Sequence, residues 1–299
     1  MKYYLAIDLG GTTFNAGLFD ESYNLIHVTS KDKIRNYNSK QSILNAMISQ
    51  LEFLINKFNI KNDSINALGI ASPGPINIQK GIILDTLNLK HFNNFKICEY
   101  FKKKLSINTF VQNDANLFAY GEWFKEYSNS NHFLGVTLGT GFGVAFILNG
   151  QIYMGSNGMA MEYGSSPFKW GYCEQNICIK FIREQSRNIY GEELSPRVIE
   201  DKYFNNDRNA ISIYNDFGDN LGTALSHIIN LLDPEIISLG GGLSKAFKCF
   251  EKSMFNSIYK HCNKQQIKKI RIFPSNNREI STMLGACIFA NFRIKEYTI

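Results

Sequence analysis

The chain of 299 residues is informative first for what it lacks. It contains no run of about 18 apolar residues, which argues against a membrane-spanning helix. Its six cysteines are scattered rather than grouped, so they predict reduced thiols in the cytoplasm and no disulfide framework. The first residues show no succession of basic, apolar and small residues, so we expect no signal peptide.

Two common nucleotide-binding motifs are also missing. Neither a lysine-bearing P-loop nor a GxGxxG pattern occurs, which argues against a single Walker or Rossmann site. The formal charge is +6, but the lysines are dispersed and no aromatic residues alternate with them. The charge therefore predicts a solvated surface and no nucleic-acid partner. A chain of this length is expected to form two lobes with sizeable cores.

What the chain does have is a glycine-rich tip close to its N-terminus. An apolar run ends in Asp8-Leu-Gly-Gly-Thr-Thr13, and a second apolar run follows, which together predict a β-hairpin. Gly10 and Gly11 would let backbone N–H groups approach a phosphate, and Thr12 and Thr13 add hydroxyl donors. Asp8 is placed to bind Mg²⁺ directly or through water. A plain turn between two strands remains the alternative for this segment alone.

Two further glycine clusters follow the same plan. Val136-Thr-Leu-Gly-Thr-Gly-Phe-Gly-Val144 is a strand-like run with a Gly/Thr tip, and Ile236-Ile-Ser-Leu-Gly-Gly-Gly-Leu-Ser244 runs into three glycines. Three such tips suggest one nucleotide bound from several sides, with the first two tips on its phosphates and the third on adenosine. The candidate nucleotide contacts in these two clusters are Thr140, Gly141, Gly240, Gly241 and Gly242.

Apolar periodicity predicts alternating strands and helices in both halves. The strands are expected at 2–8, 14–20, 23–30, 65–71, 108–112, 133–138, 143–149, 151–154, 235–239 and 269–273. The helices are expected at 42–59, 97–105, 116–125, 211–232, 244–260 and 281–291, the first capped by Ser39 or Ser42. Hairpins followed by strand–helix alternation predict an α/β protein of two lobes, each a mixed sheet flanked by helices.

Four motifs in this order resemble those of the ROK sugar kinases: Asp8–Thr13, Gln112–Asn116, Leu138–Gly143 and Leu239–Gly242. The resemblance covers essentially the whole chain. It implies a two-lobed actin-like, ribonuclease H-like ATPase fold that binds ATP and Mg²⁺ in a cleft, and a homodimer. It also implies an N-terminal lobe of residues 1–116 plus a C-terminal helix at about 281–299, and a C-terminal lobe of residues 117–280.

Asp114 is the candidate catalytic base. It follows a predicted strand, and Asn113 and Asn116 beside it could orient a sugar hydroxyl. Phosphoryl transfer needs alignment, charge neutralisation and one carboxylate that accepts the proton of the attacking hydroxyl. From the residues alone, an Asx turn that caps the next helix is the alternative. The resemblance favours catalysis, and it also implies that Asn88 and the backbone around Gly74 contact the sugar.

Glu162 begins the segment Glu-Tyr-Gly-Ser165, where the family usually has Glu-x-Gly-His. In the family both charged side chains contact sugar hydroxyls, so the resemblance implies that Glu162 binds the sugar. Ser165 stands in place of the histidine. The family's histidine and a second glutamate, which Lys180 replaces here, face the C1/C2 side of the sugar. The two replacements therefore predict altered substrate choice, although an unchanged choice with a merely degenerate loop remains the alternative.

The zinc-binding segment of the family is also altered. Its histidine ligates zinc with three cysteines of Cys-x-Cys-Gly-x-x-Gly-Cys-x-Glu, whereas this chain reads Gly171-Tyr-Cys-Glu-Gln-Asn-Ile-Cys-Ile-Lys180. Cys173 and Cys178 remain, but Gly171 stands at the first cysteine. Because a structural zinc ion takes four nitrogen or sulfur ligands, we expect no zinc site. The apolar residues expected to hold the loop instead are Phe168, Trp170, Tyr172 and Ile177.

The sequence thus predicts a cytoplasmic enzyme that transfers phosphate from ATP to the 6-hydroxyl of a hexose or an N-acylhexosamine. The changes at the C1/C2 side favour N-acetylmannosamine, and glucokinase or allose kinase activity is the alternative. A sugar-responsive repressor would carry a helix-turn-helix before the first phosphate-binding strand, and here that strand is expected to begin near the N-terminus. A non-catalytic sugar-binding protein is disfavoured because Asp8 and Asp114 are both present.

Overall fold

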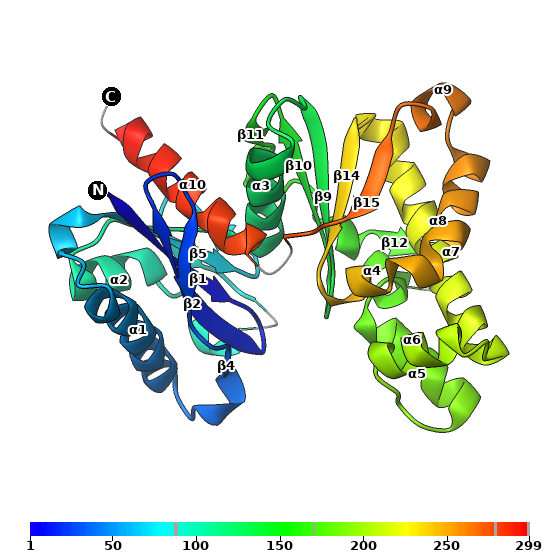
Figure 1. Ribbon diagram of the computed structural model, residues 1–299, viewed down its shortest axis with the longest axis horizontal. Helices are drawn as coiled ribbons and strands as arrows, with labels where there is room; N and C mark the ends of the chain where they lie inside the picture. The colour runs from blue at the N-terminus through cyan, green and yellow to red at the C-terminus, as the bar shows by residue number, and fades with distance from the viewer. Residues whose placement is uncertain (87–88, 170, 278–279, 298–299) are drawn as a thin grey trace. The chain divides into compact units, whose positions relative to one another are not determined.

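The computed structural model describes residues 1–86, 89–169, 171–277 and 280–297, which form two units (Figure 1). Unit 1 contains Met1–Glu126, Met154–Met159 and the C-terminal helix α10 (Ser281–Tyr297). Unit 2 contains Tyr127–Tyr153 and the segment from Ala160 through strand β15 (Arg271–Pro274). The expected boundary at residue 116 would cut helix α3 (Asp114–Glu126), whereas the structure keeps α3 whole within unit 1.

Unit 1 is built on a mixed sheet whose strand order is β3-β2-β1-β5-β8, with β4 paired to β2. Strands β1 and β2 are antiparallel, whereas β1, β5 and β8 run parallel to one another. The strands are β1 (Tyr3–Leu9), β2 (Thr13–Asp20), β3 (Leu25–Val28), β4 (Asp32–Lys33), β5 (Ile65–Ser72), β6 (Ile76–Asn77), β7 (Ile82–Ile83) and β8 (Thr109–Asn113). The helices are α1 (Lys40–Lys57), α2 (Ile97–Leu105), α3 (Asp114–Glu126) and α10.

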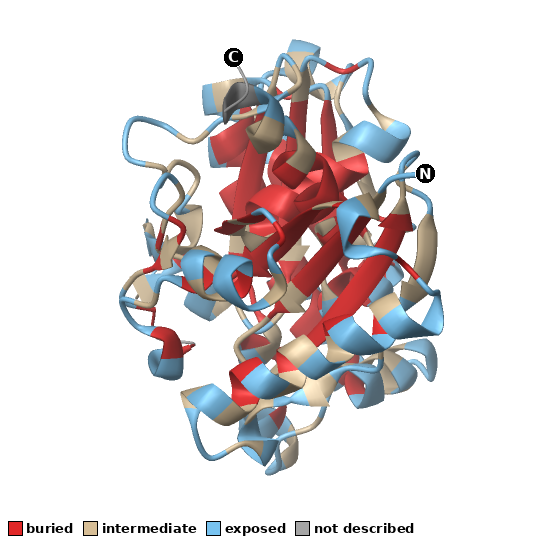
Figure 2. Ribbon diagram, turned by 90° about the vertical axis from the view of Figure 1, so that its left-hand side faces the viewer, coloured by how far each residue is buried: buried red, intermediate tan, exposed pale blue. Residues whose placement is uncertain are grey.

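Helix α1 illustrates how local sequence sets an element. Its apolar residues recur on one face and are buried against the sheet: Ile43, Leu44, Met47, Leu51 and Leu54. Ser39 and Ser42 form a reciprocal capping box, in which each side chain accepts from the other's backbone N–H at 3.2 Å. The predicted cap is therefore confirmed, and it satisfies two N–H groups that the helix itself cannot bond. Figure 2 shows that buried residues run along the strands of the sheet.

Helix α10, the last element of the chain, packs closely on α3 and β5 through glycines. A Cβ atom added at Gly121 of α3 would lie 2.9 Å from the backbone nitrogen of Gly285 in α10. One added at Gly69 of β5 would lie 2.9 Å from Cβ of Ala286. Since such distances are too short for a side chain, glycine is required where α10 meets these two elements.

Unit 2 repeats the sheet of unit 1. Its strand order is β11-β10-β9-β14-β15, with β9 and β10 antiparallel and with β9, β14 and β15 parallel. The strands are β9 (His132–Leu138), β10 (Phe142–Leu148), β11 (Gln151–Ile152), β12 (Pro167–Phe168), β13 (Gly171–Tyr172), β14 (Ile236–Gly240) and β15 (Arg271–Pro274). The helices are α4 (Cys173–Asn176), α5 (Ile179–Tyr190), α6 (Pro196–Phe204), α7 (Arg208–Leu232), α8 (Phe247–His261) and α9 (Lys264–Ile267).

Helices α7 and α8 form the main helical layer of unit 2 and pack against each other (Figure 1). Gly222 of α7 allows the close approach, because an added Cβ there would lie 2.7 Å from Cβ of Ser257 in α8. The buried face of α7 carries Ile213, Phe217, Leu221, Leu225 and Ile228. No helix among the described residues is both long enough and apolar enough to span a membrane.

Most of the expected elements are found within a few residues of their predicted bounds, although α10 continues past its expected end at 291 to Tyr297. The sequence analysis did not predict the helices α5, α6 and α9, the short helix α4 within the expected loop 165–180, or the two-residue strands β4, β6, β7, β12 and β13. Helix α7 begins at Arg208, three residues before the expected start at 211, because Asp207 caps it by accepting from Asn209 N at 2.8 Å and Ala210 N at 3.2 Å.

Candidate functional site

The three parallel strands of unit 1 end at one edge of its sheet. Asp8 of β1 pairs with Ala71 of β5, and Ala71 pairs in turn with Gln112 of β8. The residues that follow these positions therefore gather at the carboxyl ends of the strands, where open α/β sheets bind ligands. These residues include most of the predicted site of unit 1: the glycine tip, the Gly74 turn and the Asn113-Asp114 pair.

The first glycine tip is a tight hairpin end. Gly10 N donates to Thr13 O at 2.8 Å, and Thr12 O accepts from Ile34 N at 2.9 Å, which fixes the tip against the segment after β4. Asp8 lies below the tip and is only partly accessible. Burial raises the pKa of the Asp8 carboxyl, and the positive charge of Lys31 opposes that rise. A desolvated carboxylate is the kind of hard oxygen donor that Mg²⁺ takes, so Asp8 fits the predicted metal contact.

Asn113 and Asp114 lie where β8 passes into α3. The Oδ1 atom of Asn113 accepts from Ala115 N at 3.0 Å and from Asn116 N at 3.2 Å, so Asn113 caps α3. One carboxylate oxygen of Asp114 accepts from Ala115 N at 2.8 Å. The predicted Asx cap is thus present, and Asn113 supplies most of it. The bond from Ala115 N also fixes the position of the Asp114 carboxylate at the N-terminus of α3.

Asn116, which the sequence analysis placed beside the sugar, has a different role. It is buried, and its Nδ2 donates to Gln112 Oε1 at 3.3 Å. The same Gln112 oxygen accepts from Asn113 N at 2.7 Å. The expectation that Asn116 orients a hydroxyl was wrong, because its amide is used to fix the turn between β8 and α3.

Gly74 lies in the turn Ser72-Pro-Gly-Pro75 after β5, and the Gly74–Pro75 peptide bond is cis. The turn is held by a bond from Leu84 N to Pro75 O at 3.0 Å. Gly74 itself is partly accessible, so its backbone can be reached by a ligand. Asn88, the other residue predicted on this side of the sugar, lies outside the described residues.

The second glycine tip, at residues 139–141 of unit 2, joins β9 to β10. Gly139 N donates to Gly141 O at 3.0 Å, and Gly139 O accepts from Ile179 N at 2.9 Å, which attaches the tip to the start of α5. Thr140 is exposed at its apex. The tip corresponds in position to the first glycine tip, since each joins the first two strands of its sheet.

The third glycine cluster follows β14, whose Gly240 pairs with Thr137 of β9. Gly241 has φ +78°, and an added Cβ there would lie 2.7 Å from the carbonyl carbon of Leu138. Gly242, by contrast, has open space around the position of an added Cβ. Gly241 is therefore required by the backbone, whereas Gly242 leaves room beside the chain for a ligand.

Glu162 precedes the short 3-10 helix Tyr163–Ser165 and Ser165 is its last residue, and both are exposed. Desolvation raises the pKa of the Glu162 carboxyl, and the charge of Glu174 raises it further. Ser165 N donates to Glu162 O at 3.2 Å, which holds the two residues on one turn. The structure thus brings these two predicted sugar contacts together in unit 2.

The segment 162–178 is attached to α7 by side chains that the sequence analysis missed. Tyr163 Oη lies 2.6 Å from His227 Nδ1. Lys169, at the turn of the β12–β13 hairpin, donates from Nζ to Oδ1 of the buried Asn220. Asn220 Nδ2 in turn donates to Asn176 O at 3.2 Å. Three polar contacts thus join the segment 162–178 to α7.

The apolar anchors of this segment were predicted in part. Phe168 and Ile177 are buried, as expected, but Tyr172 is exposed. In the hairpin, Tyr172 pairs with Pro167, which is also exposed, and Phe168 pairs with Gly171. Because paired residues share one face of a hairpin, Tyr172 points away from the core that Phe168 enters. Trp170 lies outside the described residues.

The remaining thiols do not form a zinc donor set. Cys173 is buried, and burial, with a smaller contribution from Glu174, raises the pKa of its thiol to about 12. A zinc ligand must be a thiolate, which this environment disfavours. On the side-chain face of Gly171, where the family has a cysteine, lies Gln175. Within the described ranges, no group of three or more His, Cys, Asp or Glu residues is arranged to hold a metal ion.

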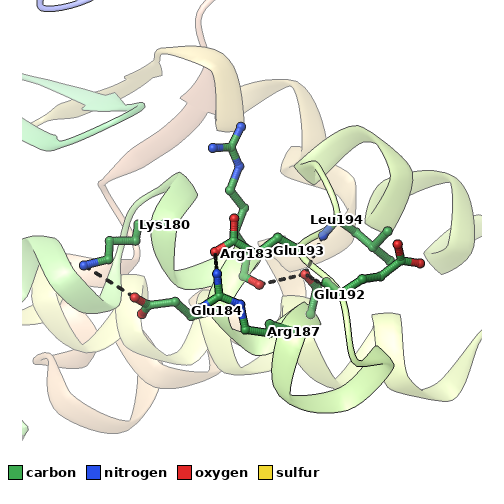
Figure 3. Close-up of polar contacts among 8 residues, drawn as sticks. Lys180, Arg183, Glu184, Arg187, Glu192, Glu193 and Leu194 are labelled. Atoms are coloured by element: carbon green, nitrogen blue, oxygen red, sulfur yellow. Dashed lines mark hydrogen bonds and ion pairs between the residues drawn. The ribbon is translucent and has the colours of Figure 1, made fainter.

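Lys180, which replaces a glutamate of the family pattern, lies on the surface of α5. Its Nζ is 3.4 Å from Oε1 of Glu184, one helical turn further on. Figure 3 shows this pair and a second one, between Arg187 and Glu193, at the other end of the helix. Lys180 also lines a surface depression of about 330 Å³ with Gln175. An exposed ion pair contributes little to stability, so the contact with Glu184 does little to hold Lys180 in place.

Two units with one sheet order, each with a glycine-rich tip between its first two strands, define the actin-like ATPase fold. The ROK family glucokinase from Streptomyces griseus, solved with glucose and AMPPNP, has this fold. It matches the chain with a TM-score of 0.83 at 18% identity, over 97% of this chain and 99% of the other. The fold class expected from the sequence is thereby confirmed.

The chain belongs to the ROK family, whose model matches residues 4–292. It is 28% identical over 263 residues to the N-acetyl-D-glucosamine kinase of Haemophilus influenzae (strain 86-028NP), covering 81% of this chain and 84% of that protein. It is 25% identical over 315 residues to the glucokinase of Thermotoga maritima, covering 97% of this chain and 98% of that protein. The family expected from the four ordered motifs is therefore confirmed.

Proposed function

We propose that this chain is a sugar kinase that transfers the terminal phosphate of ATP to the 6-hydroxyl of a hexose or an N-acylhexosamine. Membership of the ROK family and the kinase names of the two relatives support the reaction class. The observation that carries the proposal for this chain is the edge of the sheet in unit 1. There Asp8 lies at the end of β1, and the Gly74 turn and Asp114 directly follow β5 and β8, which run parallel to β1 and in register with it.

In this proposal Asp114 is the catalytic base. Its carboxylate is fixed by the bond from Ala115 N, so it can accept the proton of the attacking hydroxyl without first being ordered. Asn113 uses Oδ1 to cap α3, which leaves its Nδ2 to donate to the sugar. Gly74 and Asn88 of unit 1 and Glu162 and Ser165 of unit 2 are the proposed further sugar contacts.

The nucleotide would be bound by the glycine tips. Residues 10–13 and 139–143 are proposed to contact its phosphates through backbone N–H and hydroxyl groups, and residues 240–242 its adenosine. Asp8 would hold Mg²⁺, which when bound neutralises charge on the phosphates. The sugar and ATP are thus the proposed partners, and zinc has no proposed role because the donors around Cys173 do not suit it.

N-acetylmannosamine is the proposed acceptor. The support is local: Ser165 and Lys180 stand where the family has a histidine and a glutamate, so the sugar's C1/C2 side meets different groups. Glucose and allose are the alternative acceptors. N-acetylglucosamine is a further alternative, because one relative is named N-acetyl-D-glucosamine kinase. We further propose a homodimer, as the family resemblance implies. We also propose a cytoplasmic location, since all six cysteines are free thiols.

A coupled assay of ADP release tests the function. The purified chain with Mg²⁺-ATP is offered N-acetylmannosamine, N-acetylglucosamine, glucose, mannose, allose and fructose in turn, with the Asp114→Asn variant as the background. We expect turnover with at least one sugar and the highest kcat/KM with N-acetylmannosamine. A preference for glucose would overturn the acceptor assignment, and no turnover above the Asp114→Asn background with any sugar would overturn the kinase assignment.

The same preparation tests the two remaining parts of the proposal. Metal analysis of protein made without an affinity tag should find no zinc, and one zinc ion per chain would contradict this. Light scattering coupled to gel filtration should give twice the mass of the 34.1 kDa chain. A monomer at micromolar concentration would overturn the proposed dimer but would leave the assigned reaction intact.

A further inference from the structure

Glu174 makes an unexpected contact with the second glycine tip. Its Oε2 accepts from Phe142 N at 3.1 Å, the first backbone N–H after the tip 139–141. An added Cβ at Gly141 would lie 2.6 Å from the same oxygen, so the carboxylate fills the space beside this glycine. A negatively charged oxygen therefore already lies against the backbone that is proposed to bind phosphate.

The surroundings of Glu174 do not explain a structural need for its charge. In the described part of the chain, no lysine or arginine forms an ion pair with it, and more than a third of its surface is accessible. The nearby carboxyl of Glu162 is also affected, since the charge of Glu174 helps to raise its pKa. In the family pattern this position is a glycine, so the carboxylate is a feature of this chain.

Backbone N–H groups in a glycine-rich turn bind anions without regard to whether they come from a carboxylate or a phosphate. We propose that Glu174 is an intramolecular competitor for the phosphate site of the tip 139–141 and thereby sets the affinity of this chain for its nucleotide. Glu174 must leave Phe142 N when the phosphates bind, and its charge then lies close to theirs. The inference rests on the proposed function, because it takes ATP as the ligand of this tip.

The test measures nucleotide binding by calorimetry on the full chain, with Mg²⁺-AMPPNP and, separately, with adenosine. Glu174→Gln keeps a carbonyl oxygen that can accept from Phe142 N but removes the charge. We expect it to bind AMPPNP about five- to tenfold more tightly, the range for one solvent-screened charge near an anion. Adenosine affinity should change less than twofold, because adenosine carries no phosphate.

Glu193→Gln is the matched control. It removes the same charge from the same unit, but Glu193 follows the far end of α5, a helix that begins beside Gly139 and extends for about 18 Å. Its AMPPNP affinity should stay within twofold of wild type. Glu174→Gly, which introduces the family's residue, should tighten AMPPNP binding as well, and thermal unfolding checks that each variant is folded.

The results separate the two proposals. If the wild type binds AMPPNP and Glu174→Gln binds it equally or more weakly, the inference is overturned and the proposed function stands. An equal gain for adenosine, or for Glu193→Gln, would also overturn it, since the effect would then not concern phosphate at this tip. If the wild type binds no nucleotide and phosphorylates no sugar, the proposed function fails, and the inference fails with it.

Discussion

Gly241 and Gly242 give a matched pair of adjacent substitutions, of which only the first is expected to lower stability. In Gly241→Ala, the new Cβ would overlap the backbone of Leu138, lying 2.7 Å from its carbonyl carbon and 2.8 Å from its nitrogen. The backbone at Gly241 also has φ +78° and ψ 176°, a conformation almost confined to glycine. In Gly242→Ala, the new Cβ meets no atom within 4 Å.

The magnitude for Gly241→Ala follows from two costs. Forcing a side chain into this backbone conformation costs about 1–3 kcal/mol. Overpacking against a backbone that cannot move freely costs about another 1–3 kcal/mol. The sum of about 2–6 kcal/mol is a large part of a typical free energy of unfolding, about 5–15 kcal/mol. For a unit of this size it corresponds to a fall in Tm of about 5–20 °C.

The assay is thermal unfolding followed by circular dichroism, with nucleotide binding measured on whichever variants stay folded. Gly242→Ala should keep the wild-type Tm within a degree or two and should weaken adenosine binding if the open space beside Gly242 receives the nucleoside. A Gly241→Ala variant as stable as the wild type would refute the argument from backbone geometry. An equal loss of stability in both variants would refute it too, because only one of the two sites is crowded.

Three further predictions concern the site. Asp114→Asn should lower kcat by about 10²–10⁴-fold and leave AMPPNP affinity within twofold of wild type, since it removes the catalytic base and keeps the shape of the side chain. A variant with half of wild-type turnover would exclude Asp114 as the base. Asp8→Asn should abolish Mg²⁺-dependent turnover yet raise Tm at pH 7. Burial raises the pKa of Asp8, so the native state loses stability as pH rises through that pKa, and an asparagine, which does not ionise, avoids this loss of stability. A lower Tm would contradict this. Lys169→Met should raise the KM for sugar severalfold and speed amide hydrogen exchange in residues 162–178, because the bond from Lys169 to Asn220 holds that segment. Lys169→Arg should restore both values. Unchanged exchange in Lys169→Met would contradict this role of Lys169.

The sequence predicted the elements of the fold well because each is set by local patterns. The apolar repeat of α1 and its serine cap depend on no distant partner, and the glycine tips can be identified in the sequence as turns between apolar runs. Helices α5 and α6 were missed because they follow a segment that the family resemblance presented as a loop. The division at residue 116 was placed inside α3 because the packing of α3 on α10 joins segments far apart in the sequence.

The site was predicted in part for the same reason. Asp8, Asp114 and the glycine tips could be found because strand ends and glycines are visible in the sequence. The contact of Glu174 with Phe142 spans 32 residues, and that of Lys169 with Asn220 spans 51. Neither pair leaves a local pattern, since both depend on how the segment 162–178 lies against β10 and α7. The function of Asn116 was misread because its partner, Gln112, could be identified only from the folded turn.

The close packing of α10 on α3 and β5 has a consequence for folding during synthesis. Strand β5 and helix α3 emerge early in synthesis, but α10, which packs on both, follows unit 2 in the chain. One face of the sheet of unit 1 therefore stays uncovered while unit 2 is translated. Because domains fold as their residues leave the ribosome, unit 2 can fold before unit 1 is complete. A chain that lacks α10 would leave the apolar face of unit 1 exposed and prone to aggregation.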